Sequence, residues 1–305
     1  MTDRYKVTVG IPLFRSAPFL ETILGNIRAI REKDVEVIIS DRHCLDDTID
    51  RLADALSGRP NIRFLKATDA LDWVGNINLL MRESSGTYFR FLPHDDISPA
   101  GSLEAMLAAL EADPVPILAY APTKAIDFEG LPLPEKDEPA PHPAAADISW
   151  NADLVLRMIW SGYFNGAFKG VVRMKEVRER ELWIRSTLDQ ILPERCWLFA
   201  LSLLGRFVFV PDALYIKRFH PGSVHSGWRI NGSNYLSVAD TMQAYVRDLL
   251  DKPELAGYCC ADIDTHARLM AAWAGSRDTI PYPTYQPLEA AEAARLRSVT
   301  LAARS

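Results

Sequence analysis

The sequence predicts an α/β fold, with a mostly parallel sheet flanked by helices on both faces. Over roughly the first 120 residues, short branched apolar runs alternate with segments whose apolar residues recur at helical spacing. The strand-like runs are almost continuously apolar, which is typical of strands that crossover helices bury on both faces. Ligands of such sheets bind beyond the carboxyl ends of the strands, so a site is expected among the residues that follow each strand.

The predicted elements follow one another in order along the chain. Ser16 is the expected N-cap of the first helix, and Asp46 and Asp47 can cap the second. Strands are expected at 7–13, 35–39, 62–65, 88–92, 117–120, 207–210 and 214–219, and helices at 19–30, 49–56, 73–81, 103–110, 153–160 and 193–204.

A change of pattern in the middle of the chain sets the expected domain organisation. Residues 131–147 hold five of the twenty prolines, which predicts a loop. The strand–helix alternation stops after this loop, and the last part of the chain reads as helical. We therefore expect one domain over 1–230, in halves 1–125 and 126–230, followed by a helical extension over 231–305.

Composition excludes several classes of protein. Lys and Arg total 34 against 40 for Asp and Glu, so the net charge of −6 gives no basic footprint for wrapping nucleic acid. The four cysteines lack the CxxC spacing of a thiolate zinc site and do not form a disulfide framework. No apolar stretch reaches the ~18 residues of a spanning helix, and the N-terminus lacks a signal-peptide pattern. A cytoplasmic protein without a transmembrane segment is expected.

The Arg-rich tail leaves two readings open. Arg295, Arg297 and Arg304 could touch the inner face of a membrane, which would make the protein peripheral to it. The simpler reading is a helix that is solvated or that pairs with a second copy of the chain in a homo-oligomer.

The strongest chemical signal follows the strand at 88–92. Asp95 and Asp96 are adjacent there, and a bound cation is one way to satisfy two carboxylates that repel each other. Magnesium and manganese take oxygen ligands, usually a few carboxylates together with substrate phosphates. The alternative is an Asp that caps the next helix. The first strand–helix turn, IPLFRSAPF, has no glycine fingerprint, which argues against a dinucleotide site and a P-loop.

Several motifs, in this order and spacing, resemble the family 2 glycosyltransferases with the GT-A fold. The resemblance covers roughly residues 5–228 and makes 1–125 the nucleotide-sugar half and 126–230 the acceptor half. The segment PERCWLFALSLLGRFVFVPDALYIKRFHPGSVH resembles the second half of the family. The motifs of the first half are Pro12, Asp41, Asp46 with Thr48, Asn78 eight residues before Gly86 with Tyr88, and Asp95 with Asp96.

This resemblance implies an inverting, metal-assisted enzyme that moves a sugar from a nucleoside-diphosphate sugar to an acceptor hydroxyl. The acceptor would be a glycan or a lipid-linked sugar in glycan or polysaccharide biosynthesis. The implied cofactor is manganese or magnesium, which offsets the charge of the departing diphosphate. By resemblance, Asp96 and His220 hold the metal, and Pro12, Phe14, Asp41, Asn78, Asp95 and Arg218 bind the nucleotide-sugar.

The acceptor hydroxyl needs a general base. The family places an acidic residue eleven positions before a helix-ending Gly, and counting back from Gly205 gives Glu194. Asp189 is the runner-up if the register differs. The alternative for Glu194 is a favourable charge in the first turn of a helix.

Two turns depart from the family pattern. Residues 13–15 read Leu-Phe-Arg and residues 42–44 read Arg-His-Cys, where the nucleobase would be recognised. The base pocket is therefore expected to discriminate differently from the standard uridine site of the family. A zinc site from His43, Cys44 and Asp46 is a minor alternative. Aromatic residues on the expected acceptor side could stack on sugars or belong to the core. They are Trp150, Trp160, Tyr163 and Phe164.

Two other functions stay open. A degenerate member would bind a nucleotide-sugar or glycan without turnover, and the altered turns favour it, whereas the presence of Asp41, Asp96 and Glu194 argues against it. A sugar nucleotidyltransferase would usually carry a Gly-rich phosphate loop after the first strand, which this sequence lacks.

Overall fold

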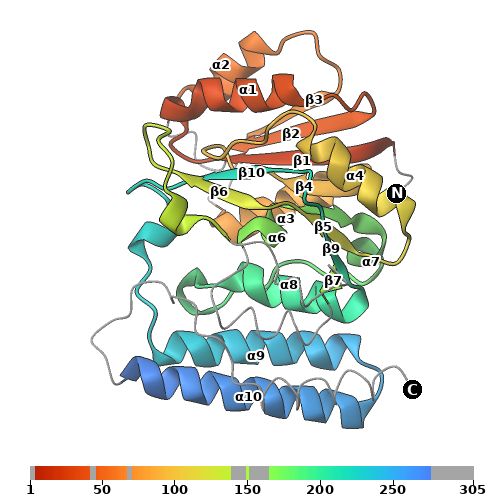
Figure 1. Cartoon of the computed structure of the whole chain (residues 1–305), viewed down its shortest axis with the longest axis vertical. Coiled ribbons are helices and arrows are strands. Elements are labelled where there is room, and N and C mark those ends of the chain that lie inside the picture. Colours follow the sequence, from red (N-terminus) through yellow and green to blue (C-terminus); the bar gives the residue numbers. More distant parts are fainter. Residues whose placement is uncertain (1–3, 42–45, 67–70, 139–148, 151–164, 276–305) are drawn as a thin grey trace. The chain divides into compact units, whose positions relative to one another are not determined.

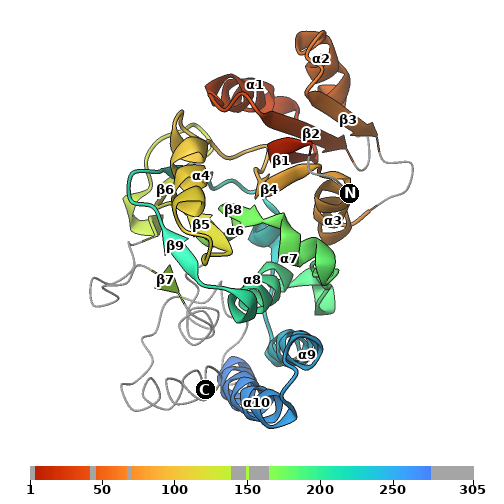
Figure 2. The same cartoon turned by 90° about the vertical axis from the view of Figure 1, so that its right-hand side faces the viewer.

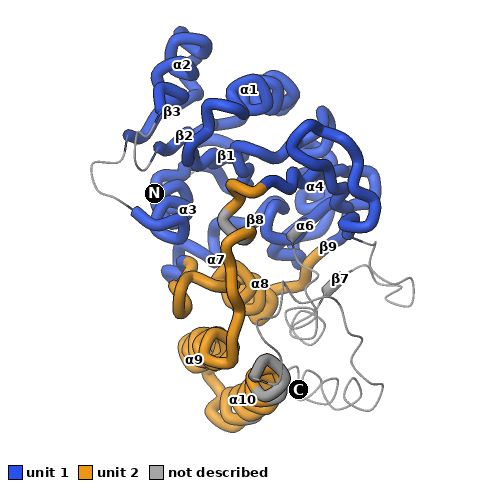
Figure 3. The backbone as a smooth tube through the Cα atoms, turned by 90° about the vertical axis from the view of Figure 1, so that its left-hand side faces the viewer, with its two compact units in different colours: residues 1–148, 165–183, 208–220 blue, residues 149–164, 184–207, 221–305 orange. Residues whose placement is uncertain are grey.

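The computed structural model describes residues 4–41, 46–66, 71–138, 149–150 and 165–275 (Figure 1). The chain forms two compact units that alternate along the sequence (Figure 3). Unit 1 comprises residues 1–148, 165–183 and 208–220, and unit 2 comprises 149–164, 184–207 and 221–305. The expected helices at 153–160 and in the tail lie outside the described residues.

The first part of unit 1 alternates strands and helices as predicted (Figures 1 and 2). Strands β1 to β4 pair in parallel in the order β3-β2-β1-β4, which confirms a mainly parallel α/β fold. The elements are β1 (Tyr5–Leu13), η1 (Ala17–Phe19), α1 (Leu20–Ala29), β2 (Val35–Asp41), α2 (Thr48–Ala55), β3 (Ile62–Lys66), α3 (Trp73–Glu83), β4 (Gly86–Phe91), α4 (Ser102–Ala112) and β5 (Leu118–Tyr120).

The rest of unit 1 contains short elements, several of which have no sequence periodicity. The sheet of unit 1 continues as β4-β8-β5-β9, with β8 antiparallel to both β4 and β5. Strands β6 and β10 form a separate parallel pair. The elements are β6 (Thr123–Ile126), η2 (Pro134–Lys136), α6 (Asn165–Phe168), β8 (Val171–Arg173), α7 (Met174–Glu179), β9 (Phe207–Phe209) and β10 (Tyr215–Arg218).

Alternate residues of β1 face opposite sides of the sheet. Val7, Val9 and Ile11 belong to one buried cluster with the apolar faces of α1, α2 and α4. On the other side, a Cβ added to Gly10 would lie 2.7 Å from the Phe89 ring and 3.2 Å from Cβ of Leu80 in α3. Helices therefore cover both faces, as the continuous apolar strands predicted.

The predicted helix caps are confirmed only in part, because Ser16 does not cap the first helix. The Ser16 hydroxyl accepts a hydrogen bond from the Phe14 amide at 2.9 Å and makes no cap, because a 3₁₀ turn precedes α1. Asp46 does bind a free amide at the start of α2: its carboxylate accepts from the Thr48 amide at 3.0 Å. The same carboxylate accepts from the amide of Ala17, in η1, at 3.2 Å. The Asp47 side chain makes no capping hydrogen bond.

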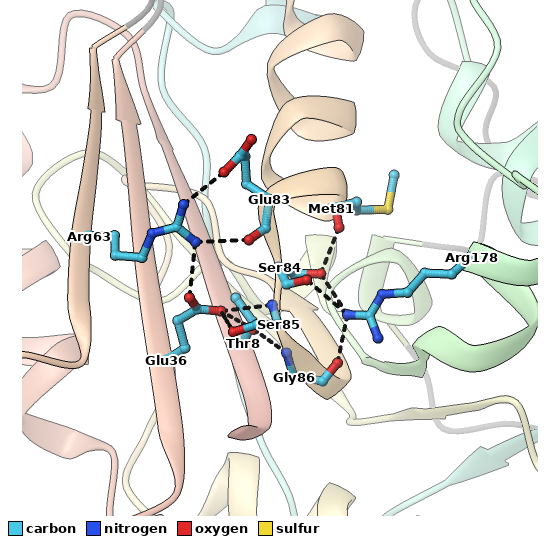
Figure 4. A network of polar contacts seen from close by, with 9 residues as sticks. All are labelled: Thr8, Glu36, Arg63, Met81, Glu83, Ser84, Ser85, Gly86 and Arg178. Carbon is cyan, nitrogen blue, oxygen red and sulfur yellow. Dashed lines mark hydrogen bonds and ion pairs between the residues drawn. The ribbon is translucent and has the colours of Figure 1, made fainter. Parts of the chain in front are cut away.

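A buried polar network closes the amino ends of the parallel strands (Figure 4). Glu36 is 2% exposed and accepts from Thr8 Oγ1 at 2.7 Å, from Ser85 N and Oγ at 2.9 Å each, and from Arg63 Nη1 at 3.1 Å. We call Thr8, Glu36, Arg63 and Ser85 the amino-end network. Burial raises the pKa of Glu36, but these hydrogen bonds outweigh burial and hold the pKa below its usual range.

Gly86, the first residue of β4, lies beside this network where β4 runs close to β1. A Cβ at position 86 would lie 2.4 Å from the Thr8 amide nitrogen. That contact is with backbone and cannot be relieved by a side-chain rotation. The Gly86 carbonyl also accepts from Arg178 Nη2 of α7 at 2.8 Å. Glycine is therefore required where β1 and β4 approach each other.

Unit 2 is mainly helical in its described part. Helix α9 packs against both α8 and α10. Its first turn has a capping box in which Asn231 and Asn234 bond reciprocally. None of the described helices combines the length and apolar composition needed to cross a bilayer. The elements are β7 (Ser149–Trp150), η3 (Leu188–Gln190), α8 (Pro193–Leu204), η4 (Val224–Gly227), α9 (Gly232–Leu249) and α10 (Pro253–Gly275).

Candidate active site

The carboxyl ends of β1, β2 and β4 lie along one edge of the sheet. Leu13 pairs with Asp41, and β4 pairs in parallel with β1 on its other side. The loop after β4 folds back onto the end of β1, because His94 Nδ1 donates to the Pro12 carbonyl at 3.1 Å. A carbonyl only accepts, so Nδ1 carries the proton, and burial lowers the pKa of His94. Pro12, Asp41 and Asp95 therefore share this edge.

Asp95 and His220 form a close pair in unit 1. His220 Nε2 donates to Asp95 Oδ2 at 2.9 Å, and the two side chains are 10% and 14% exposed. His220 comes two residues after the end of β10, so the pair joins the loop after β4 to the end of β10. Burial alone would raise the pKa of Asp95, but the hydrogen bond from His220 and the field of both histidines lower it to about 2.

Asp96 has the opposite environment. It is 3% exposed, and its carboxylate accepts from the Tyr215 hydroxyl and from the Arg218 amide, the latter at 2.7 Å. Burial and the neighbouring Asp95 charge raise the pKa of Asp96 to about 7. Asp95 is thus ionised beside a histidine, whereas the buried Asp96 has a pKa close to neutral pH.

The Arg218 side chain is folded against main-chain carbonyls. Nε donates to the Asp95 carbonyl at 3.0 Å, and Nη1 donates to the carbonyls of Asp127 at 3.1 Å and Phe128 at 2.8 Å. The residue is 8% exposed. Sequence reasoning selected Arg218 for its fork of donors, and the structure directs that fork at the backbone.

Aromatic rings surround the histidines of this site. The Phe19 ring centroid lies 5.5 Å from that of His94 and 5.1 Å from that of His220. Phe128 lies 6.1 Å from His220 and is 47% exposed. Sequence reasoning did not select these residues: Phe19 reads as the apolar start of a helix, and Phe128 follows a short strand without a pattern. The His-Asp-Asp run was the only sequence signal for His94.

The expected nucleoside side consists of buried polar residues at the ends of β1, β2 and in α3. Asp41, the last residue of β2, is 4% exposed, and Asn78 of α3 is 8% exposed. Phe14 is half-buried, with the Arg15 guanidinium 5.4 Å from its ring centroid. Arg15 adopts φ 51°, in the left-handed region that disfavours side chains, so this turn is strained.

Several sequence predictions fall on residues that are not described. Arg42, His43 and Cys44 lie outside the described residues, as do Trp160, Tyr163 and Phe164. The zinc alternative cannot be placed for the same reason. Among the residues that the structure describes, no group of three or more His, Cys, Asp or Glu side chains is arranged to hold a metal ion.

The two base candidates belong to unit 2. Glu194 is half-buried in the first turn of α8, which begins at Pro193 as predicted. Asp189 is exposed in η3 with φ 55°, and its carboxylate accepts from Asn234 Nδ2 at 3.2 Å. Asp189 is therefore tied to the start of α9, whereas Glu194 opens the helix that the sequence pattern identified.

The chemistry of the Asp95–His220 pair fits one divalent cation. A carboxylate and a neutral imidazole nitrogen are both ligands of manganese, so a cation held by this pair would replace the proton that His220 Nε2 donates to Asp95. Such a cation commonly takes its remaining ligands from substrate phosphates and water. Asp96 is less suited, because both of its oxygens already accept protein hydrogen bonds. The residues of this site therefore fit a cation that arrives with a phosphorylated ligand.

Comparisons with known proteins bear on the family and the fold. Residues 8–144 match the family model described as glycosyl transferase family 2. No curated protein sequence matches the chain. Residues 1–349 of TarS from S. aureus, solved with UDP-GlcNAc, superpose with a TM-score of 0.66 at 12% identity, over 88% of this chain and 74% of that one. This chain covers 44% of the longer TarS structure, at 14% identity with a TM-score of 0.58 over 89% of this chain.

A mannosyltransferase is also similar in fold. The mannosyltransferase PcManGT from Pyrobaculum calidifontis, solved with GDP-Man and Mn²⁺, has a TM-score of 0.54 at 16% identity, over 99% of this chain and 87% of that chain. The GT-A fold and the family resemblance inferred from the sequence are confirmed.

Proposed function

We propose that this chain, a glycosyltransferase whose residues 8–144 belong to family 2, transfers a sugar with inversion. The sugar would move from a nucleoside-diphosphate sugar to an acceptor hydroxyl. The observation that carries the proposal is the Asp95–His220 pair at the carboxyl ends of the parallel strands. Structural neighbours solved with UDP-GlcNAc and with GDP-Man and Mn²⁺ support a nucleotide-sugar donor.

We assign the divalent cation, manganese or magnesium, to Asp95 and His220. When bound, it would stabilise the negative charge of the leaving diphosphate, a contribution of several kcal/mol. The sequence suggested Asp96 as a metal ligand. We instead assign it a structural role, because its oxygens accept hydrogen bonds from Tyr215 and from the Arg218 amide. Asp96 then fixes the loop that presents Asp95.

The nucleoside part of the donor is assigned to the edge formed by β1, β2 and α3. Asp41 would accept from the nucleoside, and Pro12, Phe14 and Asn78 would line the same edge. The position of Asp41 at the carboxyl end of β2, the edge at which parallel sheets bind ligands, supports this assignment.

The acceptor hydroxyl would lose its proton to Glu194, with Asp189 as the runner-up. The position of Glu194 in the first turn of α8, eleven residues before Gly205 as in the family pattern, supports it. A glycan or lipid-linked acceptor, a cytoplasmic location and a role in polysaccharide biosynthesis stay predictions.

Calorimetry with uridine and guanosine diphosphates tests the proposal. We expect binding of at least one nucleotide that strengthens about tenfold or more with Mn²⁺ or Mg²⁺ and weakens in EDTA and in Asp95→Asn. Asp54→Asn, at an exposed position of α2, is the matched control and should bind as wild type. Equal affinity with and without chelator would contradict the metal role. Tight metal-dependent binding without turnover of any donor would instead identify a degenerate binding protein.

A further inference from the structure

Arg218 links three segments that build the candidate site. Its amide donates to Asp96 Oδ1 at 2.7 Å, and its Nε donates to the Asp95 carbonyl at 3.0 Å. Nη1 donates to the carbonyls of Asp127 and Phe128. Three of the five N–H donors of the guanidinium therefore hold main chain, in two loops that are far apart in sequence.

The turn that Arg218 holds is itself well ordered by hydrogen bonds. The Asp127 amide donates to the Leu131 carbonyl at 2.9 Å, and the Gly130 amide donates to the Asp127 carbonyl at 3.2 Å. The Leu131 amide donates to Asp127 Oδ1 at 2.7 Å, and Gly130 closes the turn with φ 92°. This turn, residues 127–131, presents the half-exposed Phe128 ring 6.1 Å from the His220 ring.

The same guanidinium thus controls both partners of the Asp95–His220 pair. It holds the main chain of Asp95, and it belongs to the strand that ends two residues before His220. The carbonyl partners and the low exposure of Arg218 leave its fork directed into the protein. A lysine has one ammonium on a flexible stem and cannot reproduce this planar, three-carbonyl arrangement.

We propose that Arg218 is a positioning residue, which joins the Asp95 loop and the 127–131 turn and so sets the Asp95–His220 pair and the Phe128 ring before the donor binds. The proposal rests on the proposed function for the identity of the ligand, and it differs from the direct phosphate contact that the sequence suggested. A phosphate ligand acts through its charge, whereas a positioning residue acts through the shape of its fork.

The first test needs no donor. Hydrogen exchange is measured on the full chain for wild type, Arg218→Lys and the control Arg63→Lys. We expect Arg218→Lys to raise exchange of the amides of 127–131 and to leave residues 84–86 unchanged. Arg63→Lys, which removes the guanidinium that donates to Glu36 and to the carbonyl and carboxylate of Glu83, should do the reverse. Wild-type exchange at 127–131 in Arg218→Lys would overturn the proposal.

The second test separates charge from shape. We expect Arg218→Lys and Arg218→Met to weaken Mn²⁺-dependent nucleoside-diphosphate binding alike, by about 10- to 100-fold, as for other residues that orient metal ligands. Arg218→Lys within about threefold of wild type, beside a weak Arg218→Met, would make Arg218 a phosphate ligand and overturn the proposal. If wild type binds no nucleotide, the proposed function fails while the exchange measurement still decides the role of Arg218.

Discussion

The two ends of the parallel sheet each bury a carboxylate, and they treat it in opposite ways. Glu36 at the amino end and Asp96 at the carboxyl end are 2% and 3% exposed. Glu36 receives four hydrogen bonds, one of them from Arg63, and its pKa is lowered. Asp96 faces the charge of Asp95, and its pKa is raised to about 7. Similar burial therefore accompanies a lowered pKa at one end, where hydrogen bonds and a guanidinium compensate the carboxylate, and a raised pKa at the other, where a second carboxylate is adjacent.

The chain thus places its unfavourable carboxylate interactions at the carboxyl ends of the strands and not at the amino ends. A buried charge with enough donors fixes the fold, and the amino-end network locks the start of β4 against β1. Two adjacent carboxylates with perturbed pKa values, at the edge where parallel sheets bind ligands, are typical of a functional site. The comparison predicts that variants at the amino end change stability and that variants facing the site change turnover.

The largest effect is expected for the base. Glu194→Gln should lower kcat by about 10²- to 10⁴-fold, the usual contribution of general-base catalysis, with donor affinity unchanged. Asp189→Asn should have a much smaller effect, and Glu36→Gln should leave kcat of the folded protein within about twofold. Turnover and donor affinity of all three variants are the measurements.

The outcomes for these variants separate the assignments. A larger loss in Asp189→Asn would move the base to that residue. Near-normal turnover in both would remove the base from this part of unit 2. A large loss of kcat in Glu36→Gln, at a temperature where the variant is folded, would show that the amino end of the sheet also affects turnover.

The second prediction concerns stability. Glu36→Gln keeps the shape of the side chain but loses the charge that Arg63 pairs with and part of its acceptor capacity. We expect the free energy of unfolding to fall by about 1–3 kcal/mol, measured by urea denaturation at pH 7.5. Asp54→Asn, which removes an exposed carboxylate of the same unit, should change it by less than about 0.5 kcal/mol. Equal stability of Glu36→Gln and wild type would show that the network does not stabilise the fold.

Sequence patterns could predict the elements with strong periodicity. The helix expected at 193–204 is α8 (Pro193–Leu204), and β1 to β4 lie where the branched runs are. Strands β6 and β8 were missed because four and three residues carry no period. The position of Asp95 and Asp96 beyond β4 also followed from the sequence.

The environments of the two carboxylates did not follow from the sequence. They depend on long-range contacts: Tyr215 reaches Asp96 across 119 residues of chain, and Arg218 reaches the Asp95 carbonyl across 123. Local spacing indicates which residues lie at the edge of the sheet. It does not indicate which oxygen a distant hydroxyl or guanidinium will engage, so the partners of Arg218 required the structure.

The smallest effect is expected on the pH dependence of stability, for which Asp96 and Glu36 should behave in opposite ways. The pKa of Asp96 is raised from 3.8 to about 7, so between these pH values the folded state holds a proton that the unfolded state has lost. The contribution of Asp96 to stability therefore falls as pH rises from about 4 to 7 and is constant above. The pKa of Glu36 is lowered, so its contribution has the opposite sign: it is present above about pH 4.5 and is lost as pH falls through the folded pKa.

Asp96→Asn mimics the protonated acid, since its amide can donate to Tyr215 and its carbonyl can accept from the Arg218 amide. Relative to wild type, this variant should gain a Tm difference on the order of a few degrees between pH 5 and pH 8, measured in EDTA. Glu36→Gln should lose its Tm deficit only below about pH 4.5, and parallel Tm curves for Asp96→Asn and wild type would show that Asp96 is ionised throughout.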